Sequence, residues 1–182
     1  MTPAASTSHQ IRHVWEEVAA RTLRHVDLGP GRSFLNVAAG SGALSIAAAC
    51  TGADVTAVDV SPTVIVRLEE RSHSEKLDIE THVMDGAHLD FEDDSFDVVS
   101  VLSDVSTFLD VVTRLAEMMR VTRPCGQVQV VALGSVEEAR FRNFFGGAGL
   151  SEVRVIAEQT AIPIAAAESP TTELTIAIGT KL

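Results

Sequence analysis

The chain has 182 residues, a length typical of a single domain, and 46% of these residues are hydrophobic. Its formal net charge of −11 repels a phosphate backbone, which argues against nucleic acid as a partner. No apolar run approaches the roughly 20 residues that cross a bilayer, and the polar N-terminus lacks the pattern of a signal peptide, so we expect a cytoplasmic protein without a membrane span.

Strand patterns and helix patterns alternate along the chain, which predicts one α/β domain, residues 1–182, with a mainly parallel sheet. After eight residues predicted to be disordered, the first helix is expected over residues 9–26, because apolar positions recur at helical spacing from Ile11 to Val26. Further helices are predicted over Ala43–Cys50, Pro62–Ser72, Leu109–Val121 and Val136–Phe145. Strands are predicted over Phe34–Ala38, Val55–Val60, Ile79–Met84, Phe96–Leu102, Val128–Leu133, Val153–Glu158 and Leu174–Ile178.

Two cysteines, Cys50 and Cys125, fall inside segments predicted to be structured. Free cysteines behave as small hydrophobic residues and are usually buried, and cytosolic proteins keep them reduced. We therefore predict two buried thiols without a disulfide. No metal site is predicted.

The segment Ser33–Asp59 has the order strand, glycine turn, apolar helix, second strand and a single carboxylate. Gly40 and Gly42 allow a sharp turn and remove side chains where a ligand would meet the backbone. Helix N-terminal amides then face that ligand. Asp59 ends the second strand about 20 residues beyond the turn, where a carboxylate accepts hydrogen bonds from ribose hydroxyls. The segment predicts a nucleoside site.

A second carboxylate, Asp85, follows the third predicted strand. It suits the amino group of an adenine better than a phosphate. Dinucleotide binding is the nearest alternative, because the sequence Gly40-Ser41-Gly42-Ala43-Leu44-Ser45 approaches the GxGxxG pattern. A dinucleotide enzyme needs a second nucleotide-binding half or a substrate domain, and too little chain remains for either.

From Ile11 to the C-terminus, the chain resembles class I S-adenosylmethionine-dependent methyltransferases, close to the ubiquinone/menaquinone-type small-molecule methyltransferases. The family's first motif, LDVxxGxG, is matched by Leu35–Gly42, its ribose-binding acid by Asp59 and its adenine-binding acid by Asp85. Its DDSFDVV and RVLRPGG stretches are matched by Asp93–Val99 and Arg120–Gly126. The resemblance implies a doubly wound, Rossmann-like sheet of seven strands, mostly parallel with an antiparallel last strand.

The resemblance also implies S-adenosylmethionine as the cofactor and a small molecule as the methyl acceptor. The cofactor-binding residues that it implies are Asn36, Ala38, Gly40, Gly42, Asp59, Val60, Asp85, Gly86 and Ser103. Asn36 stands where the family has Asp or Glu, and its lack of charge predicts weaker binding of the cofactor. Cys125 stands where the family has glycine and is expected to affect only the turn.

Methyl transfer requires mainly the alignment of acceptor and methyl group. Near the methyl group we expect His13, Trp15, Asp104 and Phe108. His13 is predicted as a catalytic base if the acceptor must lose a proton, and the alternative is a solvated helix histidine. Asp104 is predicted to close over the methionine end of the cofactor, and the alternative is a loop or helix-cap acid. Trp15 is alternatively a core residue.

Family members often carry a long insertion after the fifth strand that covers the acceptor, and Leu133-Gly134-Ser135 leaves no room for it. The acceptor site is then expected to be walled by the N-terminal helix, by Ser103–Phe108 and by Ala161–Pro170. The apolar run Ala161–Ala167 is either packing under the sheet edge or a contact for substrate or for a second subunit, as in a homodimer. Two functions remain open, an active methyltransferase or a cofactor-binding or scaffold domain that has lost turnover.

Overall fold

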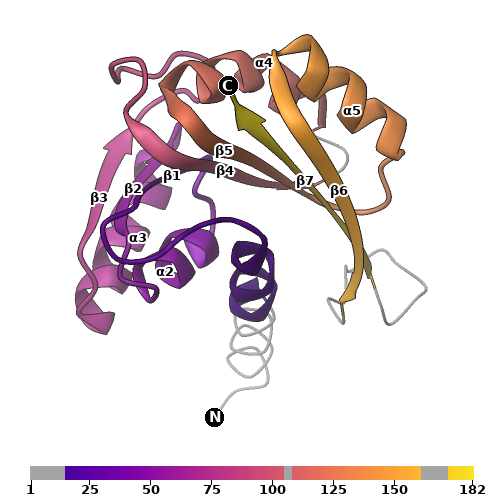
Figure 1. Ribbon diagram of the computed structural model, residues 1–182. Coiled ribbons are helices and arrows are strands. Elements are labelled where there is room, and N and C mark those ends of the chain that lie inside the picture. The colour runs from indigo at the N-terminus through magenta and orange to yellow at the C-terminus, as the bar shows by residue number, and fades with distance from the viewer. Residues whose placement is uncertain (1–14, 105–107, 161–171) are drawn as a thin grey trace.

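The computed structural model describes residues 15–104, 108–160 and 172–182, with the backbone alone at residues 104, 108–112 and 172. A helix over residues 15–22 runs into a short 3-10 helix, η1 (Leu23–His25), and strands and helices then alternate (Figure 1). The strands are β1 (Ser33–Val37), β2 (Asp54–Asp59), β3 (Ile79–Val83), β4 (Phe96–Asp104), β5 (Thr122–Leu133), β6 (Leu150–Thr160) and β7 (Thr172–Lys181). The further helices are α2 (Ala43–Ala49), α3 (Pro62–Glu75), α4 (Phe108–Val121) and α5 (Glu138–Gly147).

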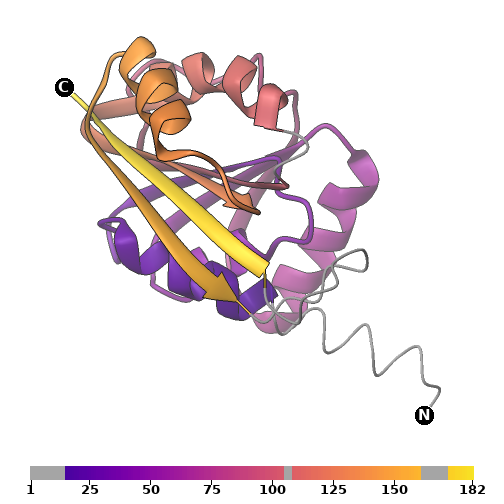
Figure 2. The ribbon, with the colours of Figure 1, turned by 90° about the vertical axis from the view of Figure 1, so that its right-hand side faces the viewer.

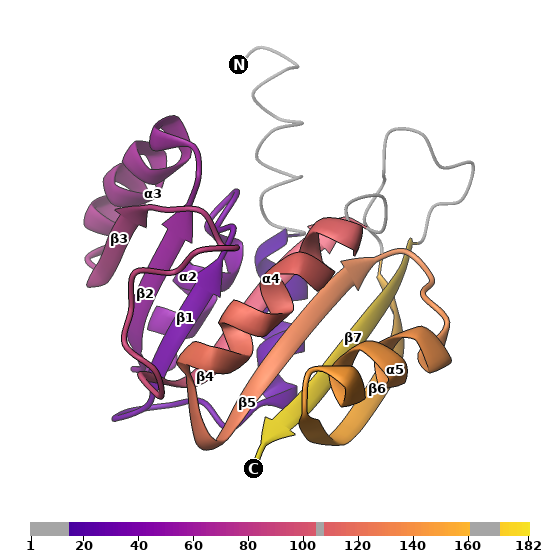
Figure 3. The same ribbon diagram turned by 90° about the horizontal axis from the view of Figure 1, so that it is seen from above.

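The seven strands form one sheet in the order β3-β2-β1-β4-β5-β7-β6, which Figure 3 shows from above. Strands β1 to β5 are parallel, whereas β7 is antiparallel to both of its neighbours. Helices cover both faces: α4 and α5 lie on one side, and α2, α3 and the first helix lie on the other (Figures 1 and 2). This arrangement confirms the predicted doubly wound, Rossmann-like fold with an antiparallel last strand.

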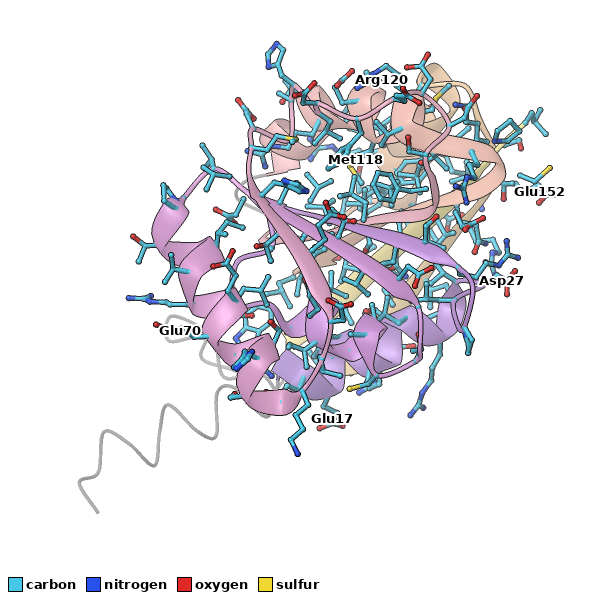
Figure 4. The ribbon with its side chains drawn as sticks, turned by 90° about the vertical axis from the view of Figure 1, so that its left-hand side faces the viewer. Glu17, Asp27, Glu70, Met118, Arg120 and Glu152 are labelled. Carbon is cyan, nitrogen blue, oxygen red and sulfur yellow. The ribbon has the colours of Figure 1, made fainter. Side chains whose placement is uncertain are left out.

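Aliphatic side chains dominate both core layers, as expected for parallel strands that are covered on both faces. One layer joins Val37, Val99 and Val130 to Leu115 and Met118 of α4. Figure 4 shows Met118 between α4 and the sheet, and its side chain is fully buried. The opposite layer packs the first helix and α2 against the other face, and Trp15 is half-buried beside it.

Polar side chains interrupt the second layer in one row. Asn36, Ser100 and Gln129 are register partners on β1, β4 and β5, and each is at most 1% exposed. Ser100 Oγ donates to Gln129 Oε1 at 2.9 Å, and Gln129 Nε2 donates to the carbonyl of Thr22 at 2.8 Å. Gln129 therefore fastens the C-terminal end of the first helix to the centre of the sheet.

The prediction of buried thiols was wrong, because both cysteines are exposed. Cys50 follows α2 as its C-terminal cap residue. Cys125 lies in the turn at the start of β5 with a φ of 64°, a left-handed conformation that glycine adopts more easily. The preference of cysteine for burial is a statistical tendency, and here the local backbone decides the outcome.

Several elements extend beyond their predicted ends. The sequence predicted six residues for the sixth strand and five for the seventh, whereas β6 has 11 and β7 has 10.

Pro62 occupies the first turn of α3 with Ser61 as the cap residue, where the missing N–H of proline costs nothing. In the part of the chain that the structure describes, every helix is too short or too polar to cross a lipid bilayer.

Candidate functional site

The glycine turn lies between β1 and α2, at the carboxyl ends of the parallel strands. Ala38, Gly40 and Gly42 all have positive φ values, of 54°, 54° and 75°. A Cβ atom on Gly42 would lie 2.6 Å from Cδ1 of Leu68, so α3 packs directly on this residue. Ala38 carries a Cβ and lacks the conformational freedom of glycine, so its left-handed backbone costs on the order of 1 kcal/mol. The turn therefore holds a strained backbone.

Asp59 fixes this turn from the end of β2. Its side chain is buried, and its two carboxylate oxygens each accept one backbone N–H: Gly40 N at 3.0 Å and Ser61 N at 2.9 Å. Each oxygen keeps a further lone pair, because a carboxylate accepts about four hydrogen bonds. Asp59 therefore orders the loop and retains acceptor capacity for a ligand.

The first helix is connected to the same turn through Arg71 of α3. Arg71 forms an ion pair with Glu16 on the first helix at 2.5 Å, and Nη1 donates to the carbonyl of Ser41 at 3.4 Å. A second ion pair joins Arg71 to Glu75 on its own helix. A single guanidinium thus ties the first helix to the glycine turn.

Asp85 and Gly86 follow β3 beside Asp59. Met84 N donates to the carbonyl of Asp59 at 3.0 Å, which brings the two chain segments together. Asp85 is exposed, and its Oδ1 accepts the N–H of Ala87 at 3.0 Å. A Cβ on Gly86 would lie 2.5 Å from Cγ1 of Val37, so only glycine fits between this loop and β1. The structure therefore places both predicted acids at one edge of the sheet.

These segments enclose a cavity of about 210 Å³. Its described lining comprises Ala38, Asp59, Val60, Met84, Asp85, Gly86 and Arg114. Five of the nine predicted cofactor-binding residues are in this lining, whereas Asn36, Gly40, Gly42 and Ser103 are not. Arg114, on α4, was missed by the sequence analysis. Arginine is ordinary on a helix surface, so its spacing gave no signal.

Asn36 does not line the cavity, because its side chain is directed to α2. Its side chain is 1% exposed, and Nδ2 donates to Ser45 Oγ at 2.8 Å. Oδ1 is a buried acceptor without a hydrogen-bond partner among the described residues. Such an acceptor is costly unless a donor reaches it.

Arg120 at the C-terminal end of α4 holds the loop that begins at Asp85. Its guanidinium donates to the carbonyls of Leu89 and Phe91 and pairs with Glu117 and Asp93 (Figure 4). The hydrogen bond from Arg120 lowers the pKa of Glu117 to about 2, and the acids raise the pKa of Arg120. The motif residue Arg120 therefore stabilises one wall of the site from outside the cavity.

Asp97, inside the matched DDSFDVV stretch, lies at the opposite end of the sheet. It accepts the N–H and the hydroxyl of Ser33, each at 2.9 Å, and pairs with Arg123 and Arg32. Burial alone would raise the pKa of Asp97, but these partners hold it below its ordinary range. A cavity of about 430 Å³ lies beside these pairs. The acids that line it already have partners: Asp27 and Asp97 pair with arginines, and Glu152 accepts from Thr180. We therefore assign the ligand site to the smaller cavity, where Asp85 keeps a free oxygen among the described residues.

The two predicted catalytic side chains lie outside the description: His13 falls before residue 15, and Asp104 is described by its backbone alone. The backbone of Asp104 ends β4 beside Leu133, and Ser103 precedes it half-buried. Phe108 begins α4, with its side chain undescribed, and Ala161–Pro170 lies in the undescribed segment 161–171. Within residues 15–104, 108–160 and 172–182, no three His, Cys, Asp or Glu side chains are grouped so that they could hold a metal ion.

Comparison with known proteins adds a family match and several similar folds. Residues 35–130 match the family model described as a methyltransferase domain. The demethylmenaquinone methyltransferase of Corynebacterium glutamicum is 34% identical over 117 residues, which cover 64% of this chain and 47% of that protein. The chain spans about half the length, or less, of the curated relatives it matches first.

Solved structures resemble the fold at low sequence identity. Phosphoethanolamine N-methyltransferase 2 of Haemonchus contortus, in complex with S-adenosyl-L-methionine, superposes with a TM-score of 0.72 at 17% identity, covering 91% of this chain and 52% of that one. The [4+2]-cyclase SpnF superposes with a TM-score of 0.73 at 14% identity, covering 91% and 80%. The same fold therefore carries more than one chemistry.

Proposed function

Because the chain belongs to the methyltransferase-domain family, whose model matches more than half of it, we propose that it binds S-adenosylmethionine and transfers a methyl group to a small molecule. One observation carries this proposal: the glycine turn, Asp59 and Asp85 meet at one cavity. Asp59 retains acceptor capacity for ribose hydroxyls, and Asp85 retains an oxygen for an adenine amino group. We expect neither nucleic acid nor a metal to take part.

The residues at the cavity suit this cofactor in charge and in hydrogen bonding. Asp59 and Asp85 offer negative charge and acceptors to a ligand that carries a sulfonium and an ammonium. Asn36, two residues before Ala38, adds a buried acceptor that has no donor among the described residues. Val60, 69% exposed at the cavity, offers an apolar surface to a base.

When bound, S-adenosylmethionine supplies an electrophilic methyl group on a sulfonium that leaves readily. The chain has only to hold and align the reactants. Asp59 holds the glycine turn in its ligand-facing shape, and Arg120 holds the wall that begins at Asp85. His13 as a base and Asp104 beside the methionine end stay predictions, as do Gly40, Gly42 and Ser103 as cofactor contacts. A homodimer and a cytoplasmic location are likewise predictions.

Calorimetric titration with S-adenosylmethionine and S-adenosylhomocysteine tests this function. We expect both ligands to bind, and Asp59→Asn to weaken each by at least about tenfold, because a charge-assisted acceptor and a loop contact are lost. Asp54→Asn is the matched control, since Asp54 is exposed at the other end of β2. No heat of binding at millimolar ligand, or equal effects of the two variants, would contradict the proposal.

A cofactor-binding domain without turnover is the second candidate, and the neutral Asn36 favours it. The two candidates make the same prediction for binding and differ in product. Incubation with methyl-labelled cofactor and a pool of small metabolites is expected to give a labelled product from an active enzyme. Tight binding without any labelled product would favour the second candidate.

A further inference from the structure

Arg114 and Asp85 have opposite charges and line the same cavity, yet no ion pair joins them in the part of the chain that the structure describes. Asp85 accepts only the N–H of Ala87, through Oδ1, which leaves Oδ2 without a partner among the described residues. Arg114 is half-buried and has neither a hydrogen bond nor an ion pair within that same part. Arg120, six residues further along α4, is by contrast bonded to several partners.

The position of Arg114 is fixed by its contact with Gly86. A Cβ on Gly86 would lie 3.0 Å from Cδ and 3.4 Å from Nε of Arg114, so the arginine stem covers the residue that follows Asp85. The guanidinium therefore belongs to the end of the cavity that Asp85 occupies. Of the glycine turn, Ala38 alone belongs to the described lining, whereas Gly40 and Gly42 do not.

Within the described residues, a carboxylate with one free oxygen and a guanidinium without a partner lie at one cavity, and this pair fits a ligand that offers a donor beside an acceptor. Adenine has this pattern, since its exocyclic amino group donates and the neighbouring ring nitrogens accept. A carboxylate only accepts and a guanidinium only donates, so the two side chains complement this edge. The volume of about 210 Å³ is below the range of whole-ligand pockets and suits the nucleoside part of a larger ligand.

We propose that Arg114 is a specificity-determining residue for the nucleoside: its guanidinium donates to a ring nitrogen of the adenine while Asp85 accepts from the amino group. The inference rests on the proposed function and adds to it a contact from α4. Because Asp85 and Arg114 form no ion pair with each other in the described part of the chain, the carboxylate and the guanidinium can both bind the adenine.

Calorimetry with S-adenosylhomocysteine and 5′-methylthioadenosine tests this assignment, because the second ligand keeps the adenosine and lacks the amino-acid part. Arg114→Met retains the methylene stem over Gly86 and removes the donors. We expect it to weaken both ligands by the same factor, about tenfold or more. Arg114→Lys restores a charged donor and is expected to recover part of the affinity. Arg67→Met, on the exposed side of α3, is the control and leaves both affinities unchanged.

A loss confined to S-adenosylhomocysteine would place Arg114 at the carboxylate and overturn the assignment. Unchanged or tighter binding of both ligands by Arg114→Met would overturn it as well. Wild-type protein that binds neither ligand would contradict the proposed function itself, an outcome distinct from any effect of Arg114. Thermal unfolding of each variant without ligand shows that the affinities compare folded proteins.

Discussion

At the scale of single residues, Asn36 shows why an amide suits a position where the resembled motif has an acid. Its side chain is 1% exposed, and its only hydrogen bond among the described residues goes from Nδ2 to Ser45. No cation among them contacts it, so a carboxylate there would be a buried, uncompensated charge. The neutral amide avoids that penalty at the cost of one unpaired acceptor, Oδ1.

The variant Asn36→Asp is therefore expected to be destabilised by about 2–4 kcal/mol at neutral pH. Burial raises the pKa of the new carboxyl above its ordinary value, so the folded state binds the proton more tightly than the unfolded state. The penalty is then absent at low pH and grows as pH rises through the raised pKa.

Urea unfolding at pH 5 and pH 8 measures this change, and S-adenosylmethionine is expected to reduce it by bringing an ammonium to the site. Asn143→Asp on the exposed face of α5 is the control, with little change at either pH. A variant as stable as wild type at pH 8 would show that Asn36 is not the desolvated position described above.

At the scale of elements, α4 connects the core to the loop between β3 and β4. Its inner face buries Leu115 and Met118, while Glu117 and Arg120 hold the loop from above. Glu117 accepts the N–H of Leu89 at 2.9 Å in addition to its ion pair with Arg120. This wall of the cavity thus depends on an acid and a base that bind the loop but do not line the cavity.

From the lowered pKa of Glu117 we expect the protein to lose stability in acid. Its pKa of about 2 in the folded protein lies below the ordinary value of 4.5, so its contribution is complete above pH 4.5 and is lost as pH falls toward 2. After allowance for solvent screening, the contribution at pH 7 is about 1–2 kcal/mol.

Glu117→Gln is expected to be less stable than wild type at pH 7 and to approach it as pH falls to 3, as measured by urea unfolding. Glu138→Gln removes an exposed pair with Arg142 on α5 and is expected to change stability little at any pH. A Glu117→Gln difference that is constant with pH would contradict this role for the ion pair.

At the scale of the whole molecule, the order of helices and strands was predictable because hydrophobic periodicity and turn residues are local signals. The same signals predicted the seven strands, and the resemblance added that the last strand is antiparallel. The positions of Asp59 and Asp85 were predictable because Asp59 ends a strand and Asp85 follows the next one, and the carboxyl ends of neighbouring parallel strands lie at the same edge of the sheet. The unpaired state of Arg114 and the exposure of Cys125 were not predictable, because each depends on chain segments that only the folded sheet brings together.

Gln129 provides a test of how the first helix is attached to the sheet. Gln129→Leu leaves the buried hydroxyl of Ser100 and the carbonyl of Thr22 without partners, so we expect a loss of about 2–4 kcal/mol. For a domain of this size, this corresponds to a fall in Tm of roughly 4–16 °C.

Thermal unfolding measures this loss, with Gln127→Leu as the control. Gln127 accepts the N–H of Asp27 at an exposed position, where water replaces it. Equal falls in Tm for the two variants would contradict an anchoring role for Gln129.

The position of β7 between β5 and β6 has a consequence for the order of folding. Among the described strands β6 pairs with β7 alone, and β7 follows it along the chain. During synthesis β6 therefore has no partner in the sheet until β7 leaves the ribosome, and β5 presents an open edge for the same time. The half of the sheet from β3 to β5 can form first. Removal of β7 would take the buried residues Ile176 and Ile178 out of the core, release β6 and leave β5 as an open edge.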